Sequence, residues 1–347
     1  MSDEYIARHP LTGKPLNSGS RRSRKKKVRI IKIGPWSEIE KEDVIPLARG
    51  DISVIEVLFE GRTVKVGRPA GIRALPRMIT GPLKPMHDAL VMALADSNPE
   101  VRMAGIEVLP VCAMRDSEQL LDYLAELLDD DVSMVQQAAS HCLGDLAADF
   151  PSGTDTLLHI ELRHTVESRR KEAWRGLRSL CSIWPDVAAD HIDRLIREKE
   201  PRLRRDAASM LSRLVSRSGA KIWDLISWSL QDEDGEVRIR AASTLRPLAE
   251  SHPKIALILA EDALFDSEEK VRAKVISCLD RLDSSSTKLR SLVTSGCRVA
   301  DVAVRKACIH LITRLYSDDE ARELSIELLK QETNKELIKY LEDLAVD

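Results

Sequence analysis

The chain has 347 residues, of which 43% are hydrophobic, 31% are charged and only 3% are aromatic. So few aromatic side chains are unusual for an enzyme pocket or a β-sandwich core, whereas helices packed through leucine, valine, isoleucine and alanine fit this composition. The formal net charge is -3, and the six cysteines show no CxxC pair and no histidine at metal-ligand spacing. We therefore expect no zinc site, no disulfide framework and no cofactor.

Residues 1–30 form a basic segment with nine Lys or Arg against two acidic side chains, a net charge of +7. Its run RRSRKKKVR can attract phosphate, an acidic partner or, in a eukaryote, an import receptor, and VRIIKI could form a short strand or bind along a partner. We expect residues 1–47 to be a largely disordered tail. The candidate partner-binding residues in it are Arg21, Arg22, Arg24, Lys25, Lys26 and Lys27.

The N-terminus lacks the apolar core of a secretory signal, and no run approaches 18 apolar residues. The sequence therefore predicts a soluble intracellular protein with no membrane association, located in the cytoplasm or, in a eukaryote, also in the nucleus.

Residues 48–347 contain a repeat that is marked by leucine every 34 residues. The markers are Leu75, Leu109, Leu143, Leu177, Leu211, Leu245 and Leu279, continued at a spacing of 33 by Ile312 and Ala345. A fixed period of this length is typical of repeat architectures. We predict an all-α fold, a right-handed α-solenoid of about eight or nine helical hairpins.

The first copy of the repeat is degenerate. Its segment GDISVIEVLFEGRTVKV could be a short helix or a β-hairpin, and Pro76 interrupts its second helix. We interpret this copy as an N-terminal cap.

In the later copies, an apolar-periodic run of 10–12 residues, such as HDALVMALAD, supplies the first helix. The second helix carries an apolar stripe at positions 0, +4, +7, +8 and +11, which lie on one face at 100° per residue. In one copy the stripe reads Val101, Gly105, Val108, Leu109 and Cys112, and in another it reads Val237, Ala241, Thr244, Leu245 and Leu248. We expect this stripe to be buried.

A basic residue follows the start of the stripe in most copies, and an aspartate often stands six residues before it. The arginines are Arg68, Arg102, Arg170, Arg204, Arg238, Arg272 and Arg305, and the aspartates are Asp96, Asp232 and Asp266. A helix pair of 33–34 residues with this Asp turn and Val-Arg resembles the HEAT family. The resemblance implies a ladder in which each Arg pairs with the turn Asp of its own or the adjacent repeat. Where the acid is replaced, at Arg170 and Arg305, we expect a side chain that is freer to bind.

The opposite face of the middle second helices is basic, and residues 163–221 carry 15 basic against 8 acidic side chains. The candidate strip consists of Lys171, Arg175, Arg178, Arg205, Arg213 and Arg246, with Arg169 and Arg202 expected near its rim. Since second helices usually line the concave face of such solenoids, the strip is either a solvated face or a groove for nucleic-acid backbone or an acidic protein segment.

The segment Trp223-Asp224-Leu225-Ile226-Ser227-Trp228 is similar to a WDxxD segment of HEAT-like alkylpurine DNA glycosylases. In that family the second aspartate stabilises charge on the sugar, and here Ser227 stands in its place. We therefore interpret Trp223 and Trp228 as core or inter-repeat packing. No HExxH motif and no phosphate-binding glycine loop is present in the sequence.

These patterns predict a non-enzymatic scaffold that binds a macromolecular partner, a protein in the first place. The alternative is a nucleic-acid-binding protein, and the third hypothesis is a glycosylase-like activity in the repair of alkylated DNA. We expect no small-molecule substrate. A steep salt dependence of binding would favour nucleic acid over protein.

Overall fold

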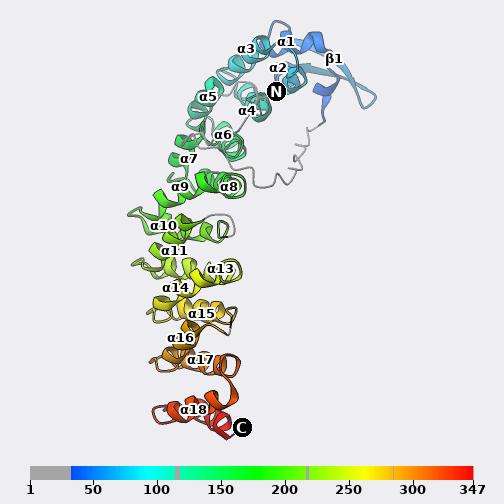
Figure 1. The fold of residues 1–347 in the computed structure, drawn as a ribbon. Coiled ribbons are helices and arrows are strands. Elements are labelled where there is room, and N and C mark those ends of the chain that lie inside the picture. The colour runs from blue at the N-terminus through cyan, green and yellow to red at the C-terminus, as the bar shows by residue number, and fades with distance from the viewer. Residues whose placement is uncertain (1–32, 114–117, 216–218, 284, 347) are drawn as a thin grey trace, which may run out of the picture. The chain divides into compact units, whose positions relative to one another are not determined.

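The computed structural model describes residues 33–113, 118–215, 219–283 and 285–346 of the chain. The predicted all-α fold is confirmed, because helical hairpins follow one another as an α-solenoid along both of its compact units (Figure 1). One unit comprises residues 1–180 and the other residues 181–347. Within the described ranges, no helix is both long and apolar enough to cross a membrane.

The N-terminal unit begins with a short 3-10 helix and a helix, followed by a β-hairpin and a second helical stretch. Their bounds are η1 Pro35–Glu38, α1 Lys41–Arg49, β1 Val54–Phe59, β2 Arg62–Gly67, α2 Arg68–Ala74 and η2 Leu75–Met78. Three further hairpins follow, made by α3 Leu83–Leu94, α4 Pro99–Cys112, α5 Glu118–Leu128, α6 Ser133–Leu146, α7 Asp155–Glu161 and α8 Glu167–Ile183, whose last residues lie in the other unit.

The predicted boundary between tail and solenoid at residues 47 and 48 is wrong. Residues 33–47 include η1 and most of α1, and α1 buries Val44, Leu47 and Ala48 in the core of the N-terminal unit. Helix α1 lies close to α2 because Gly71 carries no side chain: a Cβ there would lie 2.7 Å from the backbone nitrogen of Ala48. The segment before the repeat is therefore part of the fold.

The degenerate first copy contains a β-hairpin, which decides between the two alternatives that its sequence left open. Strands β1 and β2 pair antiparallel from Val54 opposite Gly67 to Phe59 opposite Arg62. The prediction for Pro76 is confirmed, since α2 ends at Ala74 and η2 follows it. The rest of the tail prediction, including Arg21 to Lys27, lies outside the described residues.

The described residues of the C-terminal unit form five hairpins. Their helices are α9 Pro185–Ile196, α10 Pro201–Leu211, α11 Ala220–Leu230, α12 Gly235–Ala242 with α13 Leu245–Ser251, α14 Pro253–Ala263, α15 Glu269–Leu279, α16 Thr287–Gly296, α17 Val302–Leu315, α18 Asp318–Leu329 and α19 Lys335–Val346.

The repeat markers lie in the core of each unit. The seven leucines and Ile312 are at most 1% exposed, whereas Ala345 in the last helix is half-buried. The stripe that begins at Val101 and the stripe that begins at Val237 are buried at all five predicted positions. Burial of this stripe is what each hairpin gains by stacking on its neighbours.

Candidate partner-binding surface

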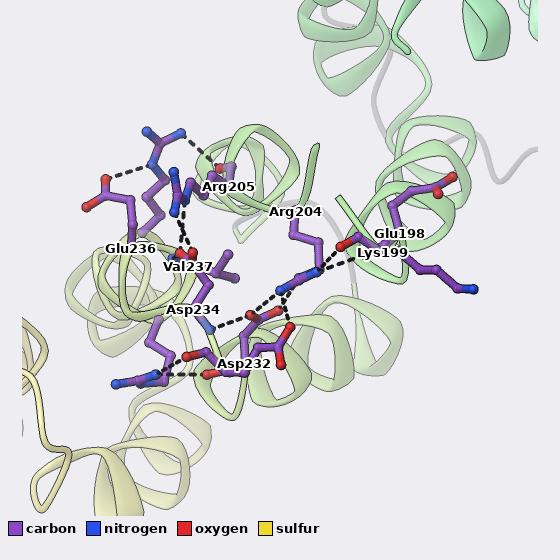
Figure 2. Close-up of polar contacts among 11 residues, drawn as sticks. Glu198, Lys199, Arg204, Arg205, Asp232, Asp234, Glu236 and Val237 are labelled. Atoms are coloured by element: carbon purple, nitrogen blue, oxygen red, sulfur yellow. Dashed lines mark hydrogen bonds and ion pairs between the residues drawn. The ribbon is translucent and has the colours of Figure 1, made fainter. Parts of the chain in front are cut away.

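The arginines at the start of the second helices connect successive repeats. In the C-terminal unit, Arg204 on α10 donates from Nε and Nη2 to the two carboxylate oxygens of Asp232, at 2.8 and 3.1 Å, and to Glu233 at 3.0 Å (Figure 2). Asp232 lies in the turn of the next hairpin, 28 residues later. The carboxylate of Asp232 also accepts from the backbone N–H of Asp234 at 2.8 Å, which holds the turn.

The same connection recurs along the C-terminal unit. Arg238 donates to both oxygens of Asp266 at 2.8 and 3.1 Å, Arg272 pairs with Asp301, and Arg305 donates to both oxygens of Glu332. Each guanidinium also donates to two backbone carbonyls in the turn of its own hairpin, as Arg204 does to Glu198 and Lys199. These carbonyls follow the C-terminal end of the first helix, where a cation is favoured. Each arginine therefore connects the turn of its own hairpin to the turn of the next hairpin.

The expectation that Arg170 and Arg305 are freer to bind is wrong. Arg305 donates to Glu332, which stands 27 residues after it in the turn of the next hairpin. The missing acid six residues before Arg305 therefore does not leave its side chain unpaired. Arg170 donates to the carbonyls of His164 and Thr165, which needs no aspartate side chain in the turn.

In the N-terminal unit the ladder starts with Arg68, which pairs with Asp96, and continues with Arg102. Arg102 donates to Asp130 at 2.7 Å and to Asp131 at 3.0 Å. In the next copy Gln136 replaces the arginine and donates to the carbonyl of Asp130 in its own turn. The described contacts of Gln136 therefore do not continue the ladder.

A buried ion pair connects the hairpin of α5 and α6 to the hairpin of α7 and α8. Arg169 is 8% exposed, donates to both oxygens of Glu161 at 2.7 and 2.5 Å, and reaches Asp129 of the preceding hairpin at 2.9 Å. Its expected position near the rim of a basic strip is wrong, because it occupies the stripe position that is Val135 or Val101 in the neighbouring copies. Its guanidinium binds carboxylates inside the fold.

Three candidate strip residues lie on α8 in the N-terminal unit. Lys171 contacts Glu167 one turn earlier at 2.8 Å. Arg175 donates to Asp145 at 2.5 Å and to Glu172 at 2.6 Å, and also to the carbonyl of His141. Arg178 is half-buried. The charges of Lys171 and Arg175 are therefore balanced by neighbouring carboxylates.

The other three candidates lie in the C-terminal unit. Arg205 donates to both oxygens of Asp234 at 3.0 and 2.5 Å, in the turn of the next hairpin (Figure 2). Arg205 lowers the pKa of Asp234 from its ordinary value of 3.8 to about 2. Arg213 and Arg246 are exposed and form no ion pair with another described residue. These two guanidinium groups are available to a partner.

A second line of polar contacts runs between adjacent second helices. It includes Arg73 with Glu107 at 2.7 Å, Arg240 with Asp206 at 3.3 Å, and Lys306 with Glu336. The exposed face of the second helices therefore carries both signs of charge, and many of its cations already have acidic partners.

The two tryptophans of the glycosylase-like segment lie in different surroundings. Trp223 is half-buried and packs edge-on against His252, with ring centroids 5.3 Å apart. Trp228 is 52% exposed, and the guanidinium of Arg197 lies 4.7 Å from its ring centroid. Of the two predicted roles of Trp228, core packing is wrong, whereas the contact with Arg197 joins it to the neighbouring hairpin. Its exposure, which the sequence reading missed, follows from its position on α11 one residue before the buried Ser229 and two after the buried Ile226.

Among the described residues, no group of three or more His, Cys, Asp or Glu side chains could hold a metal ion. All six cysteines are buried, and none is in a disulfide. Burial raises the pKa of Cys112, Cys278 and Cys308 to about 12. These thiols are therefore poor nucleophiles near neutral pH.

The stacked hairpins and their arginine ladder define the class of protein: a HEAT-like α-solenoid. Residues 87–178, which cover most of the segment from α3 to α8, match the family model described as HEAT repeats. The family match therefore identifies HEAT repeats in this segment of the chain. No curated protein matches it.

Several solved structures are similar to parts of the chain. A triple mutant of Kap121p matches 80% of the chain at 15% identity, with a TM-score of 0.47. Importin beta in an ammonium sulfate condition matches 89% at 15% identity, with a TM-score of 0.40, and Kap95p bound to RanGDP matches 88% at 12% identity, with a TM-score of 0.40. The chain spans 33%, 52% and 51% of the length of these three proteins.

Proposed function

We propose that this chain is a non-enzymatic scaffold that binds a protein partner through the exposed face of its second helices and its basic N-terminal segment. HEAT repeats present an extended surface of scattered side chains, which suits a macromolecule better than a small substrate. The proposal rests above all on the mixed charge of this surface.

Pairing of the strip cations is the observation that supports a protein over a nucleic acid. Lys171, Arg175 and Arg205 each contact at least one carboxylate. A phosphate backbone would have to displace these carboxylates, and the acidic groups would repel it. A protein surface can match both signs of charge, and its binding depends less on the release of counterions.

The experiment is affinity capture with the full chain from native lysate, with and without nuclease, followed by binding measurements on the recovered partner. Charge reversal at the two unpaired arginines, Arg213→Glu with Arg246→Glu, should weaken capture at least about tenfold if this face binds an acidic part of the partner. Lys254→Glu is the matched control, because Lys254 is an exposed lysine on the first helix α14. It should leave capture unchanged.

Labelled duplex DNA and single-stranded RNA distinguish the nucleic-acid alternative. We expect weak binding to both and a shallow dependence of affinity on salt. A steep salt slope that flattens in the Arg213→Glu, Arg246→Glu variant would contradict the proposal and favour a nucleic acid. Capture that disappears with nuclease would contradict it equally.

A further inference from the structure

The hairpin of β1 and β2 has an open edge whose geometry follows from its turn. The two turn residues, Glu60 and Gly61, have φ angles of 48° and 74°, as a type I′ turn requires. The backbone N–H and C=O groups of Phe59 and Arg62, which flank this turn, therefore point towards each other. Along each strand, the backbone groups of successive residues point alternately towards and away from the paired strand. The backbone groups of Val54, Glu56 and Leu58 consequently point away from β2.

Among the described backbone hydrogen bonds outside regular elements, none is made to residues 54–59. The side chains of the same three residues lie on the solvent face. Val54 is 51% exposed and Leu58 is 68% exposed, with Glu56 between them, whereas Val57 on the other face is buried. An apolar strand edge with free backbone groups is a site for pairing with another strand.

The two edges of the hairpin differ in charge. Strand β2 carries Arg62 and Lys65, and lysines on an edge discourage pairing. On β1 the central charged residue is Glu56, which lies 3.8 Å from Lys65 of β2 and forms no other ion pair with a described residue. A second copy of β1 paired antiparallel in register would bring two glutamates together, which destabilises a sheet. A strand with a basic residue at this point would instead continue the alternation of charge.

We propose that the open edge of β1 binds an extended segment of a partner protein, with one lysine or arginine opposite Glu56 and β-branched residues opposite Val54 and Leu58. Strand addition supplies backbone hydrogen bonds and completes a three-stranded sheet, which is more stable than an isolated hairpin. The inference rests on the proposed function in requiring a protein partner, and it uses a surface separate from the second helices.

A synthetic peptide of about nine alternating valine and threonine residues with one central lysine is the probe. The measurement is hydrogen exchange of the full chain, read at the amides of Val54, Glu56 and Leu58. The peptide should slow their exchange at least about tenfold, as expected for newly hydrogen-bonded amides. A peptide with central glutamate should protect much less, and one with a central proline, which removes a backbone donor, should not protect.

Charge reversal provides the reciprocal test. Glu56→Lys alters an exposed side chain and should leave the fold intact, yet it should reverse the preference so that the glutamate peptide protects and the lysine peptide does not. Equal protection by all three peptides, or protection by none, would overturn the proposal.

Two further outcomes would also overturn it. Protection that needs no peptide and increases with protein concentration would assign the edge to a second copy. Protection that needs no peptide and is lost in Ile31→Pro would assign it to residues 28–33 of the same chain. In either case, capture that still depends on Arg213 and Arg246 would leave the proposed function standing.

Discussion

Arg204 and Asp232 form a bidentate ion pair across 28 residues, with side chains that are only 8% and 5% exposed. Because the two side chains have lost most of their hydration, the effect of this pair on the free energy of unfolding differs from that of a surface ion pair. Removing one partner leaves an uncompensated buried charge, which is strongly destabilising.

We therefore expect Arg204→Ala to lower the free energy of unfolding by about 3–5 kcal/mol. Urea unfolding followed by circular dichroism measures the change. The control is Arg298→Ala, which breaks a more exposed inter-repeat pair with Glu327 and should change stability by less than about 1 kcal/mol. Equal losses of unfolding free energy in the two variants would show that burial of an ion pair does not determine how much it stabilises this fold.

The buried pair of Arg169 and Glu161 should behave differently when both members are replaced. Glu161→Gln alone should destabilise by about 3–5 kcal/mol, because Arg169 loses its buried counterion. The double variant Arg169→Val, Glu161→Leu introduces the apolar residues that stand at the matching positions of neighbouring copies. It should unfold at the same or a higher urea concentration than the unmodified chain, since a packed apolar pair needs no desolvation of charge.

The four proteins of this double-mutant cycle give the coupling between the two sites. Asp129 should remain hydrated in the double variant, because its side chain is 80% exposed. A double variant that is less stable than either single variant would contradict the expectation.

Stability should fall in acid because of carboxylates whose pKa is lower in the folded than in the unfolded chain. The guanidinium of Arg305 lowers the pKa of Glu332 from its ordinary value of 4.5 to about 2, and Arg205 does the same for Asp234 from 3.8. The unfolded chain binds these protons first, so the stabilisation is present above about pH 5 and is lost as the pH falls towards 2.

Urea midpoints measured between about pH 7 and pH 2.5 test this dependence. Glu332→Gln should lower stability at neutral pH and reduce the slope between about pH 4.5 and 2.5, since that position then takes up no proton. An unchanged slope in this variant would assign the acid sensitivity to other carboxylates.

The buried cysteines should be unreactive in the folded chain. Because burial raises the pKa of Cys112, Cys278 and Cys308 to about 12 and that of Cys181 to about 11, almost no thiolate forms at pH 8. Ellman's reagent should react slowly with the native protein and rapidly with all six thiols in urea. Fast labelling of the native chain would show that the helices open readily around these residues.

Much of the fold could be predicted from the sequence, because burial within a helix follows a local periodicity. Leu211 and Leu245 mark the core in the sequence and are fully buried in the structure. The same reasoning failed at Arg169, where the stripe position is polar and its partner Glu161 lies on a different helix. It also left GDISVIEVLFEGRTVKV undecided, since a short apolar run fits both a helix and a strand.

The candidate surface could be predicted less well. Helical position places Lys171, Arg175 and Arg205 on the second helices. The partner of Lys171 stands only four residues before it, whereas Arg175 and Arg205 also bind acids of other hairpins. Asp145 stands 30 residues before Arg175, and Asp234 stands 29 residues after Arg205. No single spacing connects such pairs.

The 34-residue spacing of leucines and the five-position stripe by themselves determined that this protein is a series of helical hairpins, because one apolar face per helix must be buried whatever its neighbours are. Only the tertiary structure decided which charges remain available to a partner. Ion pairing depends on distances between side chains of stacked repeats, and these distances leave Arg213 and Arg246 exposed while Arg175 and Arg205 bind carboxylates.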